Sequence, residues 1–182
     1  YAEKGGARFM PFVEQVLAGA LPQLTYKWSD TVRSLAAEVV SALYKAAVRA
    51  AAGGAGGVGA QHVAQVFGAV VKPMNEALNK EQELGVVESL LDGFHEMIEL
   101  EKTHKLGVLQ GPHINAFVEV VRNQLLRQDA RVKERAAEVE EDDDGEEEDL
   151  ATEWNVLCTA QSITRELLEL HTMGVHGGYT QT

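Results

Sequence analysis

The sequence has few of the residues on which several common protein classes depend. Its 182 residues include one cysteine, four prolines and only 6% aromatic residues. The lone Cys158 excludes a disulfide framework and favours a reducing compartment. No apolar run approaches the length of about 18 residues that a membrane-spanning helix needs. The alternation of apolar and polar residues that is typical of half-buried strands is also missing, which disfavours a β-sheet fold.

Positive charge is scarce as well, and the negative charge is concentrated in one place. The chain has 16 Lys and Arg residues against 28 Asp and Glu residues, a net charge of −12. Residues 138–149 hold ten of the acids and no base, which leaves −2 for the rest. Such a balance argues against nucleic acid as the main partner, because phosphate binding needs a basic face. Because the chain begins with Tyr1 and has no signal-peptide pattern, we expect a fragment of a longer protein.

Apolar residues recur every three or four positions almost throughout, which is the period of an α-helix. We therefore predict an all-α fold with helices over about residues 8–25, 30–52, 60–79, 83–101, 112–128 and 148–172. Pro11 and Pro112 are expected in the first turns of their helices, and Pro22 near a helix end. Ser29 or Asp30 is expected to cap the second helix through its side-chain oxygen.

These six helices form three antiparallel pairs of about fifty residues each. The pairs occupy residues 1–53, 54–106 and 107–173, the third with the acidic insertion 138–149, and residues 174–182 are expected to be a flexible tail. A repeat of this length built from helix pairs is typical of a helical solenoid. A plain helical bundle has the same periodicity, so the pattern alone leaves both architectures open.

The first pair carries a more specific pattern. Pro22 precedes Asp30, the dipeptide Val32-Arg33 and the small pair Ala36-Ala37, an order that resembles the HEAT repeat. Small residues let the two helices approach closely. Asp30 and Arg33 are the residues that could pair with their counterparts in the next repeat, forming a ladder of partly buried ion pairs. The resemblance implies an αα-superhelix (solenoid) of HEAT repeats.

The chain resembles the importin-β superfamily of nuclear transport receptors, nearest to its importin-5 (karyopherin β3) branch. The residues that carry this resemblance are Tyr1-Ala2, the segments 9–16 and 30–38, Leu125-Leu126-Arg127-Gln128, and the acidic run leading into a helix near Leu150. The resemblance implies basic cargo proteins and GTP-bound Ran as partners on the second helices of the pairs, and Phe-Gly nucleoporins on the first helices. It also implies a location in cytoplasm, nucleus and nuclear pore, with no cofactor.

The acidic run is the strongest candidate for partner binding. The predicted contact residues are Glu140, Glu141, Asp142, Asp143, Asp144, Glu146, Glu147, Glu148, Asp149 and Trp154. Ten carboxylates in twelve residues can attract Lys/Arg-rich partners, but a solvated insertion kept extended by its own repulsion has the same composition. Trp154 either packs in the core or anchors a partner. The basic residues of segment 122–135 could also fold back onto the acids.

No pattern in the sequence indicates catalysis or a bound metal. The acidic run lacks the twelfth-position Glu of a calcium loop, where Ala151 stands. The glycines of segment 54–59 follow a helix and not a strand, so they form a linker and not a dinucleotide site. His95 and Glu99 lack the second His of a zinc-protease motif, and Cys158 is expected to be a buried, inert thiol. We predict no enzyme; the alternative function is a HEAT-repeat scaffold, similar to a phosphatase regulatory subunit, without Ran binding.

Overall fold

The computed structural model describes residues 2–53, 59–109, 111–138 and 146–177, with side chains for 11–53, 59–109, 112–133, 150–170 and Thr172. These residues contain no strand, which confirms the predicted all-α fold. The elements are α1 (Ala2–Ala20), the 3-10 helix η1 (Leu21–Thr25), α2 (Asp30–Ala52), α3 (Ala60–Lys80), α4 (Leu84–His104), α5 (Gly111–Glu138) and α6 (Glu146–Gly177).

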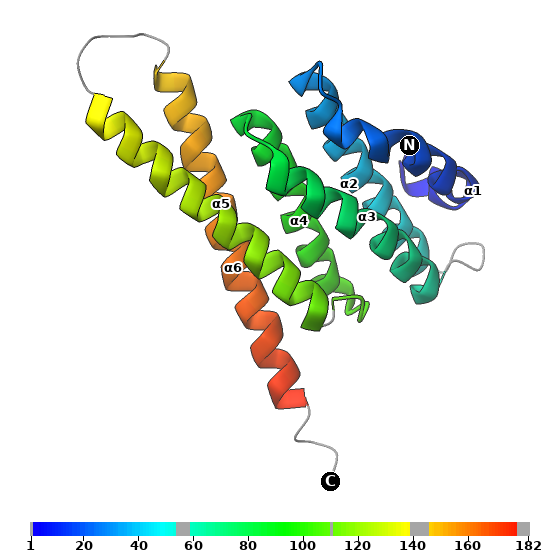
Figure 1. The fold of residues 1–182 in the computed structure, drawn as a ribbon. Coiled ribbons are helices and arrows are strands. Elements are labelled where there is room, and N and C mark those ends of the chain that lie inside the picture. The colour runs from blue at the N-terminus through cyan, green and yellow to red at the C-terminus, as the bar shows by residue number, and fades with distance from the viewer. Residues whose placement is uncertain (1, 54–58, 110, 139–145, 178–182) are drawn as a thin grey trace.

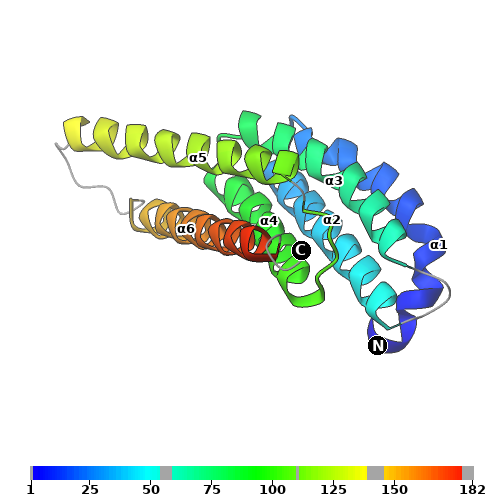
Figure 2. The same cartoon turned by 90° about the horizontal axis from the view of Figure 1, so that it is seen from below.

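The helices lie in two layers. The first helices of the three pairs, α1, α3 and α5, form one layer, and α2, α4 and α6 form the other (Figures 1 and 2). In the second layer α4 packs against both α2 and α6, and in the first layer α3 contacts α5. Each pair therefore packs on the pair that follows it in the chain. This order is repeat-like, and the HEAT superhelix itself remains a prediction.

Local signals set several of the helix ends. Ser29 caps α2, because its Oγ accepts a hydrogen bond from the Val32 backbone N–H at 3.3 Å. Pro22 has no N–H for an α-helical hydrogen bond, and α1 gives way to a 3-10 helix that has this proline in its first turn. Lys105 follows α4 in the left-handed conformation, with φ 51°, and its N–H donates to the Glu101 carbonyl at 2.8 Å.

Three of the predicted helix boundaries are wrong. Pro11 lies inside α1 and not in its first turn, because α1 already begins at Ala2. Helix α5 continues to Glu138, ten residues beyond its predicted end. The added segment is rich in Ala, Arg, Lys and Glu, which are strong helix formers, so the helix persists where apolar residues become rare. Helix α6 extends through residue 177 into the predicted tail, and residues 178–182 lie outside the described residues.

One apolar interior runs through all three pairs, and aromatic rings lie at its centre. Tyr44, Phe67, Phe94 and Phe117 are buried on α2, α3, α4 and α5. The ring of Phe67 lies 5.9 Å from that of Tyr44 and 6.4 Å from that of Phe117, and Phe94 lies 4.8 Å from Phe117. Tilted and edge-to-face contacts of this kind add to the burial energy. The cluster therefore connects the first, second and third pairs.

The hydroxyl of Tyr44 gives a direct test of this interior. The Oη atom is buried and has no hydrogen-bond partner among the described residues, and burial raises the pKa of the phenol. A buried polar group without a partner costs about 1–3 kcal/mol. We expect Tyr44→Phe to leave the free energy of unfolding unchanged or to raise it by about 1 kcal/mol, measured by urea denaturation. Tyr26→Phe, at an exposed site, is the control; a clear loss of stability in Tyr44→Phe would contradict the prediction.

Candidate partner-binding surface

The turn between α3 and α4 receives a side chain from the first pair. Arg33 makes a two-pronged salt bridge with Glu81, with 2.7 Å between Nε and Oε2 and 3.1 Å between Nη2 and Oε1. The two side chains are only 14% and 8% exposed, and the hydrogen bond to Glu81 raises the pKa of Arg33. Of the two predicted ladder residues, Arg33 thus reaches the next pair. The Asp30 carboxylate accepts a hydrogen bond from the Thr31 N–H at 2.6 Å, within its own helix.

The third pair contacts the same turn from the other side. Gln124 on α5 donates to the Leu78 carbonyl at 2.6 Å, and Arg127 donates to the Glu81 carbonyl at 3.2 Å. Arg131 donates to the Gln82 carbonyl. These donors satisfy carbonyl groups at and just beyond the end of α3, which have no partner within the helix. Arg127 and Arg131 therefore hold the second and third pairs together. The acidic side chains onto which they were predicted to fold back lie outside the described residues.

Helices α5 and α6 extend beyond α4 at the end of the third pair where α5 stops and α6 begins (Figure 1). Glu138 ends α5, and Glu146–Asp149 form the first turn of α6. Acidic residues are favourable in the first turn, because their charge interacts well with the positive end of the helix dipole. The predicted contact residues Glu140–Asp144 lie outside the described residues, and the side chains of Glu146–Asp149 do so as well.

Trp154 is at the surface, one turn after these acids. Its side chain is 67% exposed, and Leu150, four residues before it, is also exposed. The position follows from the buried face of α6, which is formed by Glu153, Val156, Ala160, Ile163, Glu166 and Leu167. Residues that lie between these positions face away from the core. The same geometry exposes Cys158, so its predicted burial is wrong.

Helix α4 carries an acidic stripe that the sequence analysis missed. Glu88, Asp92, Glu96 and Glu99 follow one another at spacings of four, four and three residues, so they share one face of the helix. This face is opposite the buried residues of α4 and lies between α2 and α6, because Glu96 contacts Lys45 of α2 and Asp92 accepts a hydrogen bond from Thr159 of α6. The spacing of the acids on a predicted second helix is the signal that could have found it.

Only part of this negative charge is neutralised by neighbouring bases. Lys45 pairs with Glu96 of the stripe, whereas Lys102 of α4 pairs with Glu169 of α6 at 2.7 Å and not with a stripe residue. Among the described residues, Glu88, Asp92 and Glu99 have no basic partner. Asp92 accepts a hydrogen bond from Thr159, whereas Glu88 and Glu99 have no such contact there. Two carboxylates of the stripe therefore remain available to an incoming cationic group.

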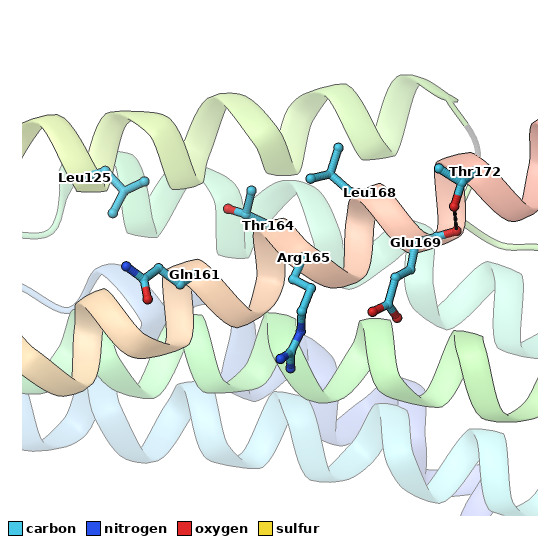
Figure 3. Close-up of a pocket in the computed structure, with 7 residues that line it drawn as sticks. All are labelled: Leu125, Gln161, Thr164, Arg165, Leu168, Glu169 and Thr172. Carbon is cyan, nitrogen blue, oxygen red and sulfur yellow. Dashed lines mark hydrogen bonds between the residues drawn. The ribbon is translucent and has the colours of Figure 1, made fainter.

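A groove between α5 and α6 is a second feature of the surface. It has a volume of about 490 Å³ and is open to solvent (Figure 3). Its lining includes Leu125 of α5 together with Arg165, Leu168 and Glu169 of α6. Helix α6 also packs on α4, and the groove residue Glu169 accepts a hydrogen bond from Lys102 of α4 at 2.7 Å.

The comparisons with known proteins neither support nor contradict a function for these surfaces. No family model matches the chain, and a search of curated proteins also gives no match. In the part of the chain that the structure describes, no helix combines the length and the apolar character needed to cross a membrane. The importin-β resemblance therefore remains a prediction. The structural support for a function comes from the surface features described above, chiefly the acidic stripe of α4.

Proposed function

We propose that this chain is a HEAT-repeat segment of an importin-β-type nuclear import receptor, which binds basic cargo and releases it when GTP-bound Ran binds. The observation that carries the proposal is the acidic stripe of α4. It lies on the α2, α4 and α6 layer, which is the layer that the resemblance assigns to cargo and Ran. The acidic residues Glu146–Asp149 open α6, which belongs to the same layer.

Electrostatics supports a basic partner for this layer. Carboxylates gathered on one surface raise the local concentration of Lys/Arg-rich segments and speed their association. Such contacts are exposed, so that salt weakens them over a Debye length of about 8 Å at physiological ionic strength. The binding is therefore expected to be strong at low salt and readily reversed, as a receptor that must release its cargo requires.

The stripe can be tested with a fluorescently labelled Lys/Arg-rich peptide and anisotropy measurements in the presence of EDTA. We expect the double variant Glu88→Gln and Glu99→Gln to bind it about twofold to thirtyfold more weakly at low salt. This range follows from about 0.2–1 kcal/mol for each exposed ion pair. The difference should shrink as salt is raised. The matched control neutralises Glu76 and Glu119, two exposed acids on α3 and α5 in the other layer.

Equal affinity in the stripe variant and in the control would contradict binding at α4. Neutralising Glu140, Glu141, Asp142, Asp143 and Asp144 in a separate variant measures the part played by the acidic run. The effect of Ran on peptide binding then distinguishes an import receptor from the alternative, a HEAT-repeat scaffold. Release of the peptide by GTP-loaded Ran, and not by GDP-loaded Ran, is expected of an import receptor. If neither GTP-loaded nor GDP-loaded Ran changes peptide binding, the result would favour a helical-repeat scaffold.

A further inference from the structure

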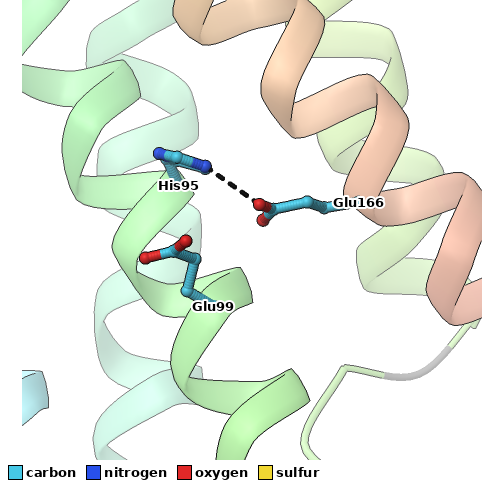
Figure 4. A group of neighbouring side chains, drawn as sticks. All are labelled: His95, Glu99 and Glu166. Carbon is cyan, nitrogen blue, oxygen red and sulfur yellow. Dashed lines mark hydrogen bonds and ion pairs between the residues drawn. The ribbon is translucent and has the colours of Figure 1, made fainter.

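Helices α4 and α6 bring a histidine and two glutamates together. The Nε2 atom of His95 lies 3.1 Å from Oε1 of Glu166. One possible ligand atom from each of His95, Glu99 and Glu166 lies within 4.8 Å of the other two (Figure 4). His95 and Glu99 are four residues apart and so stand one turn apart on the same face of α4. Glu166 approaches them from α6, on the neighbouring pair.

Of these three residues, Glu166 has the most unusual surroundings. Its side chain is only 5% exposed, and its Oε2 atom is buried without a hydrogen-bond partner among the described residues. The contact with His95 satisfies only the other oxygen. A buried carboxylate that is incompletely paired is costly, and such a group in a folded protein points to an ion or water that completes its surroundings.

We propose that His95, Glu99 and Glu166 bind a zinc ion that links α4 to α6. One imidazole nitrogen and two carboxylates suit zinc, whereas magnesium and calcium prefer oxygen ligands alone. Two ligand atoms at tetrahedral angles, each about 2.0–2.1 Å from zinc, lie about 3.3 Å apart, close to the observed 3.1 Å between Nε2 and Oε1. Glu99 is exposed, so its side chain can turn toward the ion. A water molecule completes the fourth position.

The neighbouring charges leave this position open to a cation. Lys102, on the same helix, donates to Glu169 at 2.7 Å, so its ammonium group is already paired. In the ion-free protein the His95 Nε2–H donates to Glu166. When zinc binds at Nε2, the neutral imidazole carries its hydrogen on Nδ1. The ion would tie the second helix pair to the third on the layer that carries the acidic stripe.

Titration of zinc into the full chain, followed by calorimetry, tests the site. We expect one ion per chain, with an affinity that falls about tenfold or more in His95→Gln and in Glu166→Gln, since even loss of a group that only orients a ligand costs that much. Glu88→Gln, on the same face of α4 but outside the cluster, should bind zinc as the wild type does. Zinc should raise the Tm of the wild type and not that of Glu166→Gln.

The acidic run and the other histidines offer zinc alternative ligands, and both variants leave them intact. Zinc that binds equally well to the wild type, His95→Gln and Glu166→Gln would therefore overturn the proposal, as would the absence of binding. Glutamine at 166 keeps an acceptor for His95, and far-UV circular dichroism of the ion-free variants checks that they fold. If Glu166→Gln does not fold, the partly exposed His95→Gln decides the question.

Discussion

Replacing Phe117 by alanine is expected to lower the free energy of unfolding by about 3–5 kcal/mol. The Phe117 side chain is 1% exposed, and its ring meets those of Phe94 and Phe67 at edge-to-face angles. These partners belong to the second pair, while Phe117 belongs to the third. Alanine would therefore leave a cavity at the contact between the two pairs, in addition to the loss of buried apolar area.

Both the size of the destabilisation in Phe117→Ala and the helices that it affects can be measured. Urea denaturation followed by circular dichroism gives the loss of stability. Hydrogen exchange should show that α5 and α6 lose protection before α2, because stacked pairs are stabilised chiefly by their neighbours. Val118→Ala, at the adjacent and 45% exposed position, is the control and should change stability by about 0.5 kcal/mol or less. A Phe117→Ala variant as stable as this control would show that the aromatic cluster does not hold the third pair.

Glu81→Ala is expected to cost about 3 kcal/mol, since removing one member of a buried ion pair leaves the other charge without a partner. Arg33 would keep its 3.0 Å hydrogen bond to the Tyr26 carbonyl but lose both contacts with the carboxylate. The Glu81 Oε1 atom also accepts hydrogen bonds from the N–H groups of Gln82 and Glu83, each at 3.0 Å. The substitution therefore weakens both the start of α4 and the contact with the first pair.

A double-mutant cycle separates these two effects. The variants Glu81→Ala, Arg33→Ala and the double variant, compared by urea denaturation, should give an interaction energy of about 1–3 kcal/mol. Glu76→Ala removes one partner of an exposed pair with Lys72 and should change stability by about 0.5 kcal/mol or less. An interaction energy near zero for Arg33 and Glu81 would mean that the salt bridge does not join the pairs in solution.

Much of the fold could be predicted because its signals are local. The spacing of apolar residues along α2 marks the helix, and Ser29 and Pro22 mark two helix ends through hydrogen bonds that their own chemistry permits or prevents. The prediction failed at the start of α1 and at the end of α5. The added residues of α5 are good helix formers that lack a clear apolar stripe. The added residues of α1 include Gly5 and Gly6, so helix propensity does not explain them.

The candidate surfaces depend on contacts between residues that are far apart in the chain. His95 and Glu99 are recognisable from the sequence as neighbours on one helix, but nothing in a local pattern brings Glu166 to them. In the same way Arg33 was identified as a pairing residue without its partner Glu81, 48 positions away. The exposure of Trp154 and Cys158 depends on which face of α6 meets α4. The sequence spacing left both core and surface open for Trp154, and it wrongly indicated a buried position for Cys158.

By itself, the sequence determined that this chain is helical, that its helices come in pairs, and that a dense acidic segment interrupts the third pair. Helical period, capping and charge are properties of neighbouring residues, so they can be read along the chain. Only the tertiary structure decided which charges are paired, which carboxylates of α4 remain open, and where a buried glutamate meets a histidine. Such contacts are set by how whole helices pack, because packing brings together side chains whose separation in the sequence carries no signal.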